Sequence, residues 1–119
     1  MGVDYTAYVG IGLKLATEKT YNDIIAKIDT ATGYHYDVDF SDEHIELVVD
    51  GMGGQYIYLL YVLDSHDMYD ETEGIELSLE DFRTLLAQAT PALLEALKTL
   101  GLSDFTKDAF KFISFTHVW

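Results

Sequence analysis

The sequence predicts a single α+β domain in which a mainly antiparallel sheet carries helices on one face. Several short stretches place apolar residues at every second position, which is typical of strands, and tight turns join some of them. Other stretches space apolar residues as one face of a helix requires. With 119 residues, 49% of them hydrophobic, the chain is long enough to bury a core. The predicted order along the chain is β-α-β-β-β-α-α-β.

The first strand is predicted over residues 4–15, with every second side chain turned inward. These inward residues are Tyr5, Ala7, Val9, Ile11, Leu13 and Leu15. The opposite face carries Gly10 and Gly12, which leave a shallow trough or admit a neighbouring backbone. A helix is predicted over residues 20–33, where Thr20 is the expected cap and Gly33 suits the end.

Three strands are predicted in the middle of the chain. Residues 34–40 alternate, with Tyr34, Tyr36, Val38 and Phe40 expected inward. Residues 44–50 and 55–63 are two further strands, joined by the glycine-rich hairpin turn 51–54. Because residues 55–63 are apolar on both faces, we expect this strand in the middle of the sheet.

The last third of the chain reads as helix followed by strand. Ser78 caps a helix over residues 78–89, and Thr90 with Pro91 marks a new helical start that runs to Gly101. We expect two consecutive helices, or one helix kinked at Pro91. A short helical turn is expected within residues 102–110, and the aromatic-rich residues 110–119 form the final strand.

Charge is the most informative feature for function. The formal net charge is −14, and 15 of the 21 acidic residues lie between Lys27 and Arg83, a stretch without any Lys or Arg. Such a field repels nucleic acid and anionic membranes and favours a basic protein partner. The absence of cysteine excludes disulfides, thiolate metal sites and a cysteine nucleophile. The sequence shows no signal-peptide pattern and no membrane-spanning apolar run, so we expect a cytoplasmic protein.

The candidate partner-binding residues lie in two acidic segments, 37–46 and 64–76, of which the second also contains a tyrosine. They are Asp39, Asp42 and Glu43 in the first segment, and Asp64, Asp67, Tyr69, Asp70, Glu71 and Glu73 in the second. Further tyrosines at positions 8, 56, 58 and 61 are expected around the second segment. Aromatic rings mixed with carboxylates are the chemistry that recognises an arginine-rich surface.

Other kinds of site are weaker readings of the same residues. His35, Asp37 and Asp39 share one face of a predicted strand and offer metal ligands, but any half-exposed strand alternates in this way. The segment 64–74 lacks the ligand spacing of an EF-hand calcium loop. Ser65 and His66 beside Asp64 hold the residue types of a catalytic triad, but neighbours on a strand point in opposite directions. We therefore expect no enzyme activity and no cofactor.

The overall profile resembles a known class of proteins. The stretches "MGVDYTAYVGIGLKL" and "VVDGMGGQYIYLLYV", together with the acidic, cysteine-free composition, resemble small phage-encoded inhibitors of bacterial defence, the anti-CRISPR and anti-restriction proteins. Several of these mimic nucleic acid. The resemblance implies a non-enzymatic inhibitor whose carboxylates occupy the basic, nucleic-acid-binding surface of a defence protein. The alternatives are a protein that binds a small molecule or divalent metal, and a structural subunit of a homo-oligomer that pairs through its last strand.

Overall fold

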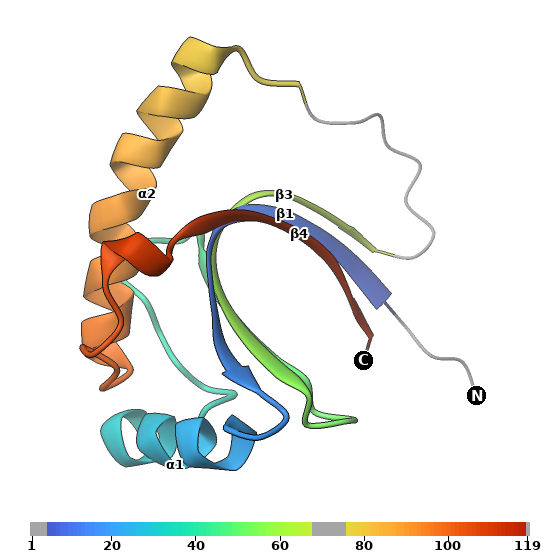
Figure 1. Cartoon of the computed structure of the whole chain (residues 1–119), viewed down its shortest axis with the longest axis vertical. Helices are drawn as coiled ribbons and strands as arrows, with labels where there is room; N and C mark the ends of the chain where they lie inside the picture. The colour runs from blue at the N-terminus through green and yellow to red at the C-terminus, as the bar shows by residue number, and fades with distance from the viewer. Residues whose placement is uncertain (1–4, 68–75, 119) are drawn as a thin grey trace.

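The computed structural model describes residues 5–67 and 76–118. The elements in chain order are β1 (Tyr5–Thr17), α1 (Tyr21–Thr32), β2 (Ile45–Val49), β3 (Tyr56–Asp67), α2 (Leu79–Thr99), a 3-10 turn (Lys107–Ala109) and β4 (Lys111–Val118). The four strands form one antiparallel sheet in the order β2-β3-β1-β4. Both helices pack against this sheet (Figure 1), so the predicted α+β class is confirmed.

The hairpin between β2 and β3 forms where the sequence predicted it. The carboxylate of Asp50 holds its turn, accepting hydrogen bonds from the backbone N–H groups of Met52, Gly53 and Gln55 at 3.2, 3.0 and 2.9 Å. Asp50 is only 7% exposed, so these three donors satisfy a buried charge. β3 is an inner strand, as expected, while β4 lies at one edge of the sheet.

The long strands curl into an arch, which Figure 1 shows for β1, β3 and β4. Register shifts lie between Val9 and Gly10 and between Lys14 and Ala16, and such bulges increase bending and twist. A side chain on Gly12 would collide with the backbone carbonyl of Leu59, so this glycine admits the neighbouring strand. Of the two readings of the glycine face, close approach of a backbone is the one the structure shows.

The depth of the arch is visible in one contact. Tyr56 lies opposite Thr17 at one end of β1, and His117 lies opposite Thr6 at the other end. The Tyr56 hydroxyl nevertheless lies 2.8 Å from Nδ1 of His117. The face that carries these two side chains is therefore the inner side of the arch.

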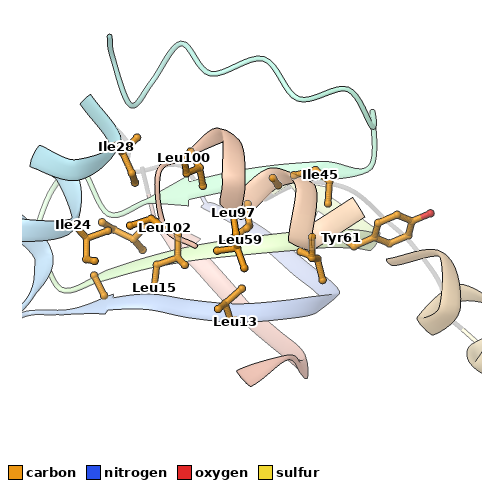
Figure 2. Close-up of a cluster of buried hydrophobic side chains, with 14 of the residues drawn as sticks. Leu13, Leu15, Ile24, Ile28, Ile45, Leu59, Tyr61, Leu97, Leu100 and Leu102 are labelled. Atoms are coloured by element: carbon orange, nitrogen blue, oxygen red, sulfur yellow. The ribbon is translucent and has the colours of Figure 1, made fainter. Parts of the chain in front are cut away.

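Apolar residues form a separate cluster on each face of the sheet. The larger cluster lies between the sheet and both helices and includes Ile28, Leu59 and Leu97 (Figure 2). The smaller one lies on the inner side of the arch, where Tyr8, Val48 and Leu60 are buried. The helices cover only the outer face, so aromatic side chains on the strands themselves fill the inner one.

The strand predicted over residues 34–40 does not form, which is a correction to the sequence reading. This segment is irregular, and Tyr34 and Tyr36 are 53% and 56% exposed rather than inward. Asp29 at the end of α1 captures His35, accepting from its backbone N–H and lying 2.8 Å from its ring Nδ1. Such local side-chain bonds compete with a strand ladder, and alternation alone cannot reveal them.

Two local details also differ from the sequence reading, and a third decides between two alternatives that it left open. The oxygen of Thr20 accepts from the N–H of Thr17 and makes no capping bond to α1, whereas Ser78 caps α2 by accepting from the N–H of Asp81 at 3.0 Å. α2 runs as one helix through Pro91, which selects the single-helix alternative. Tyr5 is 45% exposed instead of inward; it is the first residue of β1 and lies opposite Val118 of β4, which is itself 41% exposed.

Candidate interaction site

The loop before β2 brings two of the predicted acidic residues to a hollow on the outer face of the sheet. One oxygen of Asp42, Oδ1, accepts from the backbone N–H of His44 at 2.8 Å and lies 2.9 Å from Nδ1 of the same residue. These bonds, the backbone one first, hold the pKa of the Asp42 carboxyl below its usual range. Asp42 is therefore ionised at neutral pH, and it fixes the orientation of the His44 ring.

The floor of the hollow is an aromatic stack. The His44 ring lies on the Tyr61 ring, with centroids 4.9 Å apart and planes 19° from parallel. Tyr61 comes from the inner strand β3 and is only 3% exposed. Figure 2 shows its hydroxyl pointing away from the other labelled side chains of the apolar cluster. Among the described residues this hydroxyl has no hydrogen-bond partner.

Electrostatics keeps the Tyr61 hydroxyl protonated. Burial, and then the negative charge of Asp42, raises the pKa of Tyr61 above its ordinary value. The group therefore remains both a donor and an acceptor of hydrogen bonds throughout the physiological pH range.

The hollow has a volume of about 630 Å³ and opens to solvent. Its walls come from the loop before β2, from β3 and from the middle of α2, and the lining residues are Ser41, Asp42, Glu43, His44, Tyr61, Gln88, Pro91 and Ala92. Two of these carry carboxylates, and neither Lys nor Arg is among them. The polar groups are thus rich in acceptors, and Pro91 and Ala92 supply an apolar wall.

A second aromatic group lies on the inner side of the arch. The Phe115 ring stacks on both Tyr8 and Tyr58, with centroids 5.4 and 4.3 Å apart. Nζ of Lys14 lies 5.9 Å from the centre of the Tyr58 ring, and the Tyr8 hydroxyl donates to Oε1 of Glu46 at 2.7 Å. Burial, followed by that hydrogen bond, raises the pKa of Tyr8. These rings fill the arch and pair with one another, so we interpret them as a second core.

The structure brings together only some of the predicted partner-binding residues. Asp42 and Glu43 line the hollow, and Asp39 lies exposed in the same loop. Asp64 pairs opposite Val9 on the outer side of the sheet, whereas Asp67 pairs opposite Thr6 on the inner side and accepts from its hydroxyl at 2.6 Å. The remaining candidates, Tyr69, Asp70, Glu71 and Glu73, lie outside the described residues.

The split between Asp64 and Asp67 corrects the expectation that the second segment forms one surface. Its first four residues, 64–67, continue β3 instead of beginning a loop. The residue shift beside Leu63 turns Asp64 to the outer face, since Val62 pairs with Gly10 but Asp64 already pairs with Val9. Asp64 and Asp67 therefore lie on opposite faces of the sheet and do not form one surface.

The metal and triad readings gain no support. Residues 34–40 form no strand, and His35 is held by Asp29 rather than placed beside Asp37 and Asp39. Within residues 5–67 and 76–118, no three His, Cys, Asp or Glu side chains are grouped so as to hold a metal ion.

His66 does not form a triad with its neighbours. Its Nδ1 lies 3.6 Å from Oδ2 of Asp64, too long for a hydrogen bond, and Ser65 points to the opposite face of the strand.

Sequence reasoning missed the partners that complete the hollow. Tyr61 was expected only as a general aromatic neighbour, Pro91 was read only as the start of a helix, and Gln88 was not singled out. The Asp42–His44 contact has a recognisable cause, because an aspartate commonly accepts the N–H two residues later in the chain. The approach of α2 to this loop depends on long-range packing, which no local pattern reveals.

Comparison of the chain with protein-family models, curated proteins and solved structures finds no match. In the part of the chain that the structure describes, no helix has the length and apolar character needed to cross a membrane.

Proposed function

We propose that this protein is a non-enzymatic acidic module that binds a basic surface of another protein, in the manner of the phage-type inhibitors that its sequence resembles. It would act by occupying the surface on which the partner normally holds an anionic ligand such as nucleic acid. Repulsion of that ligand and steric exclusion would together inhibit the partner.

One observation carries the proposal: no ion pair joins a carboxylate to a Lys or Arg side chain where both residues belong to the described part of the chain. Between described residues, every ion pair joins a histidine to an aspartate, at His35, His44 and His66, and none involves Lys or Arg. With 21 acidic and only 7 basic residues, the negative field remains available to a positively charged surface. Charge of this kind chiefly sets the rate and specificity of association.

Salt-dependent capture tests the proposal. The full chain, immobilised, is exposed to bacterial lysate at low salt and then washed at high salt. Screening weakens attraction between exposed charges, so a basic, nucleic-acid-binding protein should bind at low salt and elute at high salt. Binding that resists high salt, or capture only of acidic proteins, would contradict the proposal.

A further inference from the structure

We propose that the hollow formed by Ser41, Asp42, Glu43, His44, Tyr61, Gln88, Pro91 and Ala92 receives the guanidinium group of an arginine side chain from the partner protein. This inference rests on the proposed function and assigns the ligand chemistry of one site within it. It goes beyond net charge, because it distinguishes arginine from lysine and a defined hollow from a diffuse acidic surface.

The hydrogen-bonding groups of the hollow call for a ligand that donates. Asp42 uses Oδ1 for His44, which leaves Oδ2 without a hydrogen-bond partner among the described residues. Glu43 is exposed, and its carboxylate likewise forms no ion pair with any described residue. A guanidinium has five N–H donors and no acceptor, so it complements carboxylates that only accept.

The Tyr61 hydroxyl is an independent polar group that a ligand in the hollow can bind. Tyr61 is 97% buried as a residue, but its hydroxyl still reaches solvent, so the group stays accessible from the hollow. Here the hydroxyl lines the hollow and finds no partner among the described residues. Its oxygen is available to accept from a donor that enters the hollow.

The aromatic floor favours arginine over lysine. The His44 ring lies nearly parallel to Tyr61, and the His44 side chain is 50% exposed, so one face of this stack remains open to solvent. A planar guanidinium can stack on such a face while its edge bonds to carboxylates, whereas a lysine ammonium is a compact point charge. Pro91 and Ala92 provide apolar surface for the stem of the arginine side chain.

The test is a titration of the isotope-labelled full chain by NMR with three blocked tripeptides that differ only in the central residue. The probes are acetyl-Gly-Arg-Gly-amide, its lysine analogue and its citrulline analogue, which keeps the planar shape without the charge. The arginine probe should shift the resonances of Glu43, His44 and Gln88 in a saturable manner. The lysine and citrulline probes should bind with an affinity at least about threefold lower.

Two conservative variants identify the groups responsible. Glu43→Gln should lower the affinity for the arginine probe about threefold, because it removes one contact to a cation. Tyr61→Phe should lower this affinity by a similar factor for the same reason. Tyr61→Phe removes a hydroxyl without a partner, so its melting temperature should not fall. Glu18→Gln, an equal charge change in the exposed turn after β1, is the matched control and should bind as the wild type does.

The outcomes separate this inference from the proposed function. Equal binding of the three probes, or arginine binding that neither variant weakens, overturns the arginine site even if a basic protein is captured from lysate. Selective arginine binding that both variants weaken supports the site. This conclusion holds even if the lysate yields no basic protein, and in that case only the proposed function fails.

Discussion

Asp50 offers the sharpest test of how the fold is held together. In an Asp50→Asn variant only one side-chain oxygen remains to accept, while the native carboxylate accepts from Met52 and Gly53 through Oδ1 and from Gln55 through Oδ2. One partly buried N–H then loses its bond to a charged acceptor, which costs about 1–3 kcal/mol, and the other two bonds lose their charge assistance at about 0.5 kcal/mol each. We expect the free energy of unfolding to fall by about 2–4 kcal/mol.

Urea unfolding at neutral pH measures this loss, with Asp37→Asn as the control. Asp37 is exposed, so the same chemical change there should alter the free energy of unfolding by less than about 0.5 kcal/mol. The slope of the free energy of unfolding against urea concentration should be the same for wild type and both variants. A shift of the unfolding midpoint then reports a change in stability. Equal midpoints for the two variants would refute the role assigned to Asp50.

The pH dependence of the same variant follows from the pKa of Asp50. Burial raises this pKa. The hydrogen bonds from the N–H groups of Gly53, Gln55 and Met52 together lower it by more, so the pKa of Asp50 lies below its usual value. A carboxyl with a lowered native pKa stabilises the fold above its unfolded pKa, and that contribution is lost as pH falls through the native pKa. Wild type should therefore lose its advantage over Asp50→Asn in acid; a difference that persists unchanged would contradict the assignment.

Two further predictions concern the arch. Gly12→Ala should lower the free energy of unfolding by about 1–3 kcal/mol in the same urea assay, because the new methyl group meets the backbone of Leu59. Gly51→Ala is the control and should cost less than about 0.5 kcal/mol, because its methyl group meets only the side chain of Tyr36. Burial lowers the pKa of His117 more than Asp50 and Glu46 raise it, so neutral His117 stabilises the fold above its unfolded pKa near 6.5, and that contribution fades as pH falls below this value. Thermal melts from pH 7 to pH 5 should show a steeper loss for wild type than for His117→Asn; parallel losses would contradict the lowered pKa of His117.

Periodic segments with clear ends could be predicted from the sequence. The hairpin at residues 50–55, the central position of β3 and the capping of α2 by Ser78 all follow from local chemistry. Residues 34–40 carried the same alternation as a strand but formed none, because Asp29 supplies bonds to His35 that the pattern does not contain. Periodicity therefore predicts an element only where no nearby side chain forms competing hydrogen bonds with its backbone.

The candidate site was predictable only in part. Asp42 and Glu43 were identified from charge, but their companions Tyr61 and Gln88 are 18 or more positions away in the sequence. Asp64 and Asp67 face opposite sides because they lie three positions apart on β3, a strand that the sequence reading ended at residue 63. A one-residue register shift beside Leu63 then decides which of the two faces each residue takes. Such shifts arise from strand coiling, and a sequence pattern with period two does not reveal where they occur.

The most direct test of the proposed function compares two charge-matched double variants for binding to the basic protein captured from lysate. Asp39→Asn with Glu43→Gln removes two charges at the loop before β2, and Glu18→Gln with Asp104→Asn removes two exposed charges elsewhere. If the acidic loop is the binding surface, the first variant should bind several-fold more weakly at low salt and the second should bind nearly as wild type does. Equal losses in both variants would show that the charge acts only as a diffuse solubilising surface and would contradict a defined binding site.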